Sequence, residues 1–186
     1  MKREIEVHYL EMASPAELRP SPARPAGFEV ERTSMPAPEL NNLFYTAVGR
    51  NWYWTDRLAW TEEQWLAWVD RPELETWIGY LGERPAGFFE LERRPGDHVE
   101  LAIFGLLPGF LGQGLGGALL TAAVERAWEM GASRVTVNTC SLDAPAALPS
   151  YQARGFRLVR TERVEKEIPE EAPGSGARAG VSSPRP

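Results

Sequence analysis

The chain has 186 residues, of which 43% are hydrophobic and 25% are charged, and its net charge is −6. This length fits one domain, and the hydrophobic fraction is too high for a mainly disordered chain. The acidic balance argues against a nucleic-acid partner, and no apolar run approaches the roughly 20 residues of a membrane span. The single cysteine, Cys140, excludes an internal disulfide, and the charged N-terminus does not resemble a signal peptide. We therefore expect a cytoplasmic protein without a nucleic-acid or membrane partner.

Strand and helix patterns alternate with turn signals in the first half of the chain. Polar and apolar residues alternate over 4–9, which predicts a strand, and four prolines within 14–27 predict a loop. Residues 28–30 predict a short returning strand. A helix is predicted over 38–48, with a proline in its first turn, and another over 62–69, after a threonine cap.

The second half predicts a strand meander followed by alternating helices and strands. Apolar runs over 76–81, 86–92 and 99–107 are separated by hairpin and turn signals. The elements predicted next are a helix over about 114–130, a strand over 134–139, a short helix within 142–154 and a strand over 156–168. This order predicts a mixed α/β fold, with a mostly antiparallel central sheet and helices on both faces. We expect one domain over 1–168 and a disordered tail over 169–186.

Five glycines fall within nine positions of "GFLGQGLGG", residues 109–117. Gly112, Gly114 and Gly117 match G-x-G-x-x-G, but a dinucleotide site needs this motif in the first strand–helix unit, with an acid about 20 residues later. A P-loop needs Lys-Ser/Thr where this chain has Leu115 and Gly116. A third interpretation is that backbone amides opening a helix bind a pyrophosphate. A tight turn that only packs the helix on the sheet is the alternative.

Two motifs resemble those of a known family. "LAIFGLLPGFLGQGLGGALL" resembles the acetyl-CoA-binding motif of the GNAT superfamily of N-acetyltransferases, and "YQARGF", which starts at Tyr151, resembles the second half of their signature. The resemblance covers roughly residues 76–160. This chain departs from the family at Leu111, where Arg or Gln is usual, and at Ala144, where Asn is usual. It also resembles a bacterial subgroup with a Trp-rich segment before the central sheet.

The resemblance implies acetyl transfer from acetyl-CoA to a primary amine of a small molecule or peptide, by direct attack of the neutral amine. It implies no metal. It places the cofactor along the end of one strand and the glycine stretch, and the residues so assigned are Leu106, Leu107, Gly112, Gln113, Gly114, Leu115, Gly116 and Gly117. Gln113 is expected to supply the side-chain contact that the family takes from the position of Leu111. The partners we expect are the acceptor and, in a homodimer, a second copy of the chain.

The resemblance assigns catalysis to Tyr151 as general acid, because a phenol with a pKa of about 10 can donate toward a thiolate. A core tyrosine is the alternative. Glu100 lies on the strand leading to the glycine stretch, on a face that we expect to carry Ala102 and Phe104, and is predicted as the base. Glu90 on the neighbouring strand is predicted to bind a cationic acceptor. A solvated strand face is the alternative for both carboxylates.

Five tryptophans lie within residues 52–68. Trp52 and Trp54 lie in a polar segment and are predicted to bind the acceptor, because indole faces attract cations and rings. A hydrophobic cluster between the helices and the sheet is the alternative. Two other functions stay open, a non-catalytic acyl-CoA-binding or sensing module and a dinucleotide-binding domain.

Overall fold

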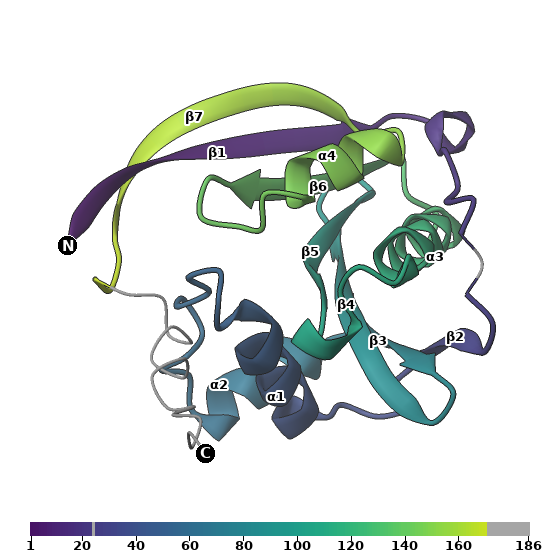
Figure 1. Ribbon diagram of the computed structural model, residues 1–186, viewed down its shortest axis with the longest axis horizontal. Helices are drawn as coiled ribbons and strands as arrows, with labels where there is room; N and C mark the ends of the chain where they lie inside the picture. Colours follow the sequence, from purple (N-terminus) through teal and green to yellow (C-terminus); the bar gives the residue numbers. More distant parts are fainter. Residues whose placement is uncertain (24, 171–186) are drawn as a thin grey trace, which may run out of the picture.

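The computed structural model of the chain describes residues 1–23 and 25–170, so most of the predicted tail lies outside the described residues. Seven strands form one sheet in the order β2-β3-β4-β5-β6-β1-β7 (Figure 1). β5 and β6 pair in parallel, and every other neighbouring pair is antiparallel. The strands are β1 (Lys2–Met12), β2 (Phe28–Arg32), β3 (Leu74–Leu81), β4 (Arg84–Arg94), β5 (His98–Leu106), β6 (Arg134–Cys140) and β7 (Arg157–Glu167). The predicted fold class is confirmed.

Helices cover both faces of the sheet, with α1 and α2 on one side and α3 and α4 on the other (Figure 1). They are α1 (Pro38–Gly49), α2 (Glu62–Val69), α3 (Leu115–Glu129) and α4 (Ala147–Ala153). The α2 helix begins as its sequence predicts, because Thr61 and Gln64 form a reciprocal capping box. None of the described helices is long and apolar enough to cross a membrane.

The main hydrophobic core lies between α3 and the sheet. One face of α3 is fully buried against apolar side chains of β1, β4, β5 and β6, through Leu119, Leu120, Ala123, Val124 and Ala127. A second cluster lies under α1, where the rings of Phe44 and Phe88 stack with centroids 5.0 Å apart. Each fully buried large side chain stabilises the fold by about 1.5–3 kcal/mol, so these two clusters hold both layers on the sheet.

The first and last strands are paired side by side and arc away from the rest of the sheet (Figure 1). β1 lies between β6 and β7, with Ile5 opposite Val164 and His8 opposite Thr139. The N-terminal strand therefore extends the sheet beyond β6. Side chains of β1 and β7, from the two ends of the described chain, therefore lie close to the C-terminal end of β6.

A β-bulge in β5 changes which side chains face each helix layer. Leu101 pairs with Leu91, whereas Ile103 pairs with Glu90, so Ala102 is an extra residue. Before the bulge, Leu101 faces the α3 core; after it, Ile103 faces the α1 cluster and Phe104 returns to the α3 side. The expectation that Glu100, Ala102 and Phe104 share one face is wrong, because the bulge breaks the period of two.

Candidate active site

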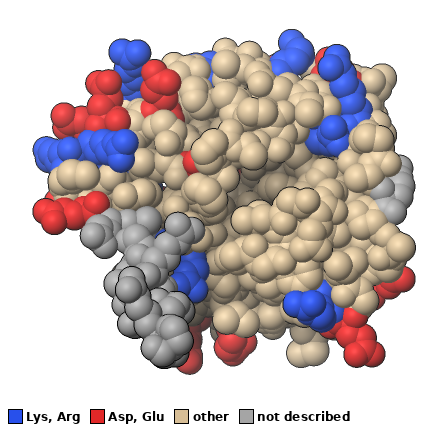
Figure 2. Space-filling view, viewed as in Figure 1, with Lys and Arg blue, Asp and Glu red and all other residues tan. Residues whose placement is uncertain are grey.

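A cavity opens where β5 and β6 part. The two strands pair at residues 98–100 and 134–136, and no pairing between them is found further along in the described chain. Beyond this point lies a cavity of about 640 Å³, lined by β5, the glycine loop, the segment after α1 and the segment between β6 and α4. Figure 2 shows a hollow near the middle of this face, surrounded mainly by uncharged side chains.

The amides at the end of β5 divide between the sheet and the cavity. The Leu107 amide donates to the Ala86 carbonyl at 2.8 Å, so it is used in the sheet and not available to a cofactor. Because amides alternate in direction along an antiparallel strand, the amide of Leu106 points away from β4 and toward the gap. Leu106 also lines the cavity. The backbone amide of Leu106 can therefore contact a cofactor in the cavity, whereas that of Leu107 cannot.

The glycine loop ends in an uncapped helix start. Gly112 and Gly114 both have a φ of 76°, a left-handed conformation that other residues rarely adopt. Gly114 is the N-cap residue of α3, and no side chain caps this helix end. The first amides of α3, from Leu115 onward, therefore face no side-chain acceptor at the positive end of the helix dipole, which is the arrangement that binds anions.

The adjacent glycines Gly116 and Gly117 have different surroundings. A Cβ atom at Gly116 would lie 3.6 Å from Leu106 Cδ1, an ordinary contact, and Gly116 lines the cavity. A Cβ atom at Gly117 would lie only 2.6 Å from Ser21 Oγ. Ser21 belongs to the Pro-rich loop, and its amide donates to Thr121 Oγ1 at 2.9 Å. Packing of this loop on α3 thus accounts for the missing side chain at Gly117, but not at Gly116.

The side chains of Gln113 and Leu115 do not line the cavity in the described structure. Gln113 is exposed, and its Nε2 donates to the Gly109 carbonyl at 3.0 Å, which closes the glycine loop on itself. Leu115 is buried against Ala86 and Phe110. Leu115 can thus contact a ligand only through its backbone, and Gln113 stabilises the loop instead of supplying the expected side-chain contact.

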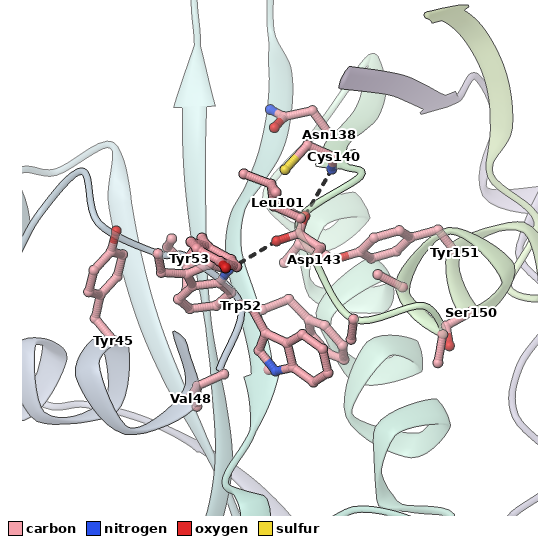
Figure 3. A pocket seen from close by; sticks show the side chains of 18 of the residues that line it. Tyr45, Val48, Trp52, Tyr53, Leu101, Asn138, Cys140, Asp143, Ser150 and Tyr151 are labelled. Carbon is pink, nitrogen blue, oxygen red and sulfur yellow. Dashed lines mark hydrogen bonds between the residues drawn. The ribbon is translucent and has the colours of Figure 1, made fainter. Parts of the chain in front are cut away.

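Tyr151 lies on α4, is buried and lines the cavity. Its ring packs edge-on against Phe104 and Phe156, with centroid distances of 6.2 and 6.0 Å. Figure 3 shows the ring extending toward Asp143. Burial, and then the negative charge of Asp143, raise the pKa of Tyr151 above its usual value. The phenol therefore stays protonated at neutral pH, as a proton donor requires.

Glu100 does not reach the cavity. It lies where β5 and β6 are still paired, and its Oε2 accepts from Arg94 Nε at 2.8 Å. The same guanidinium pairs with Glu92 through its Nη2, at 2.9 Å. The structure does not bring Glu100 near Tyr151, because the bulge places Glu100 and Phe104 on opposite faces. We therefore assign Glu100 no part in the site.

Glu90 is neither a solvated residue nor part of the cavity lining. It is fully buried, and its Oε2 pairs with Arg57 Nη1 at 3.0 Å. Asn41 Nδ2 and Trp68 Nε1 donate to the same carboxylate at 2.7 and 2.8 Å. A buried carboxylate with three donors is a structural anchor between β4 and the two helices. It is not available to bind an acceptor.

The five tryptophans divide into two groups. Trp52 and Trp54 line the cavity. Trp60, Trp65 and Trp68 instead surround the guanidinium of Arg57, which lies 4.1 Å from the Trp68 ring centroid. Trp60, Trp65 and Trp68 thus match the hydrophobic-cluster alternative, whereas binding of the acceptor by Trp52 and Trp54 stays a prediction.

Asp143 is a site residue that sequence reasoning missed. Its Oδ1 accepts from Trp54 Nε1 at 3.1 Å, and its Oδ2 accepts from the Cys140 amide at 2.9 Å (Figure 3). The same Oδ2 accepts from Thr139 Oγ1 at 2.7 Å. It lines the cavity. One sequence feature points to Asp143: it is adjacent to Ala144, which stands where the family motif usually has Asn.

Cys140 also lines the cavity, and burial followed by the charge of Asp143 raises its thiol pKa. A thiol with a raised pKa is a poor nucleophile at neutral pH, because the thiolate is the reactive form. The surroundings of Cys140 therefore do not favour a nucleophilic role.

Solved structures share this fold at low identity. A GCN5-related N-acetyltransferase from Sphaerobacter thermophilus is similar with a TM-score of 0.66 and 16% identity, over 90% of this chain and 53% of that chain. One from Kribbella flavida is similar with a TM-score of 0.63 and 19% identity, over 88% and 58%. A Bacillus subtilis acetyltransferase in complex with CoA is similar with a TM-score of 0.53 and 21% identity, over 72% and 78%. The chain thus spans little more than half of the first two proteins.

A search of curated proteins finds no match. The model of the Acetyltransferase (GNAT) family matches residues 38–156, which include the glycine loop and Tyr151. The match covers more than half of the chain. The chain therefore belongs to the GNAT family of acetyltransferases.

Proposed function

We propose that this chain is an N-acetyltransferase that transfers acetyl from acetyl-CoA to a primary amine of a small molecule or peptide by direct attack. The observation that carries the proposal is the parting of β5 and β6 beside the uncapped start of α3. The gap has an anion-binding helix end on one side and a buried tyrosine in its wall. A cofactor with a pyrophosphate and an acyl end suits both features.

The residues that would hold acetyl-CoA are mainly backbone groups. The first amides of α3 suit the pyrophosphate, and the Leu106 amide suits the polar groups nearer the acyl end. Gly112 and Gly116 have no side chains to obstruct this approach. When bound, acetyl-CoA supplies an acetyl group activated as a thioester.

The proposed role of Tyr151 is to protonate the leaving thiolate from its Oη atom. A phenol is protonated at neutral pH, as this step needs, and burial raises the pKa of Tyr151 further. The amine becomes neutral by losing a proton to water and then attacks the thioester carbonyl carbon, and the carbon–sulfur bond breaks. The second proton that its nitrogen then loses returns through water to the Tyr151 phenolate. Glu90 and Glu100 lie outside the cavity lining, so the proposal gives neither a part in this loss.

Calorimetry on the purified chain with acetyl-CoA, CoA, NAD⁺ and ATP tests the cofactor. We expect binding of acetyl-CoA and CoA and much weaker binding of the other two. A preference for NAD⁺ would overturn the proposal. An amine library assayed by thiol release then tests turnover. CoA binding without turnover of any amine would replace the enzyme with an acyl-CoA-binding module, in which Tyr151 has a packing role.

A further inference from the structure

The charged side chains that line the cavity are mostly paired. In the described part of the chain they are Asp56, Arg57, Asp143 and Lys166. Lys166 Nζ pairs with Asp56 at 2.8 Å, and Arg57 pairs with the buried Glu90 at 3.0 Å. Each of these positive charges thus has a negative partner. The remaining charge is that of Asp143.

The donors to Asp143 are all neutral. They are the Trp54 indole, the Thr139 hydroxyl and the Cys140 amide, and no salt bridge to Asp143 is found among the described residues. These contacts fix the carboxylate in place without cancelling its charge. A half-buried negative charge favours a bound cation, because screening by solvent is reduced there.

An aromatic wall lies beside this carboxylate. Trp52 is half-buried and lines the cavity, and it takes part in no ring pair or cation–π contact among the described residues. Tyr53 has a φ of 57°, a left-handed conformation that is strained for a tyrosine and typical of functional segments. Tyr53 packs near Ile5 and Leu142, which also line the cavity. The wall thus combines an indole ring that pairs with no other described ring and an apolar surface.

We propose that the acceptor is a monocationic primary amine with an aromatic or aliphatic body, whose ammonium group binds at Asp143 and whose body stacks on Trp52. This inference rests on the proposed acetyl transfer. One unpaired carboxylate matches one ammonium group, and an indole face binds both cations and rings. A second ammonium group would find no unpaired carboxylate in the described lining. A carboxylate on the acceptor would be repelled by Asp143.

Calorimetry with three probes tests this acceptor class on the full chain. The probes are 2-phenylethylamine, its neutral analogue 2-phenylethanol, and spermidine as a polycation. We expect the wild-type chain to bind the amine about tenfold more tightly than the alcohol, because only the amine carries a charge for Asp143. We expect spermidine to bind more weakly than 2-phenylethylamine.

Two variants separate charge from stacking. Asp143→Asn should bring the affinities for the amine and the alcohol within about twofold of each other, because the charge is removed. Trp52→Ala should weaken both ligands by about fivefold and keep their ratio, because the stacking surface is shared. Asp70→Asn, which removes an exposed carboxylate outside the cavity, is the matched control and should change neither.

Tighter binding of spermidine by the wild-type chain would overturn the proposal, and so would an unchanged ratio in a folded Asp143→Asn variant. The spermidine comparison needs no variant and does not depend on the folding of Asp143→Asn. Acetyl-CoA is titrated into the same samples. Failure of acetyl-CoA to bind would refute the proposed function, whereas acetyl-CoA binding without selective amine binding would refute the acceptor class alone.

Discussion

The two ends of the cavity are built in different ways. At the glycine loop, the groups that we propose bind the cofactor are backbone amides within one short segment, and glycines keep side chains away from them. At the other end, the groups are side chains from distant parts of the chain, with Trp52 after α1, Asp143 after β6 and Lys166 on β7. The comparison shows that a site made by backbone conformation is encoded locally, whereas a site made by side chains depends on the tertiary fold.

Near each end of the cavity, one residue lines the cavity and a second residue of the same type serves packing. Trp52 lines the cavity and Trp65 packs in the cluster around Arg57, whereas Gly116 lines the cavity and Gly117 packs against Ser21. Substituting both members of a pair separates ligand binding from stability. Tyr151 lies between the two ends of the cavity and is not matched with a packing residue of the same type.

The largest expected effect is on stability, at the tryptophan pair. Trp65 is 2% exposed and packs in the aromatic cluster around Arg57, so Trp65→Ala should lower the free energy of unfolding by about 3–5 kcal/mol. Trp52→Ala removes a half-buried ring outside the described core clusters, and should change stability by less than about 1 kcal/mol. Urea denaturation of both variants measures this. Equal losses would show that Trp52 is a packing residue too.

The next largest effect is on turnover, at Tyr151. Tyr151→Phe removes the proposed proton donor and keeps the ring, so kcat should fall about 100-fold or more while acetyl-CoA affinity changes less than twofold. Steady-state kinetics and calorimetry measure the two quantities. Tyr80→Phe, outside the cavity, is the control. A loss of affinity or stability with kcat unchanged would instead indicate the core-tyrosine alternative.

Substitutions at Gly116 and Gly117 should have smaller effects, and they should change stability and acetyl-CoA affinity differently. Gly116→Ala has room for its methyl group and lies in a helix, so stability should rise by up to about 1 kcal/mol. The same methyl group enters the cavity, so acetyl-CoA affinity should fall about tenfold, which corresponds to about 1.4 kcal/mol.

Gly117→Ala should behave in the opposite way. Its methyl group meets Ser21 Oγ, so stability should fall by about 1–3 kcal/mol as the Pro-rich loop is displaced. Acetyl-CoA affinity of the folded fraction should change much less than in Gly116→Ala. Thermal melts and calorimetry on both variants decide this, and the same response from both would remove the distinction between the two glycines.

The same contrast explains which features the sequence predicts. The helices α1 to α3 lie within one residue of their predicted ends, because caps and terminal glycines or prolines are local signals. The two glutamates were assigned from strand alternation alone. Neither the bulge at Ala102 nor the buried partner Arg57 can be read from that alternation, because both depend on pairing across the sheet and with the helices. Asp143 was missed for the same reason.

The smallest expected effect tests how one end of the cavity acts on Tyr151. A tyrosine with an ordinary pKa of about 10 is half ionised at pH 10. Burial and Asp143 raise the pKa of Tyr151, so the protonated form persists to higher pH. The wild-type chain and Tyr151→Phe should therefore give the same tyrosinate absorbance at 295 nm up to pH 10, although the chain has five tyrosines.

Asp143→Asn sharpens this last comparison. Removing the negative charge lowers the pKa of Tyr151, while burial still holds it above the ordinary value, so Tyr151 should begin to ionise at a lower pH than in the wild-type chain. The matched pair is Asp143→Asn with and without Tyr151→Phe, titrated under the same conditions. If Tyr151 ionises at the same pH with and without the Asp143 charge, Asp143 and Tyr151 are electrostatically independent. If its ionisation moves to lower pH, the carboxylate that we propose binds the acceptor also keeps the acid protonated.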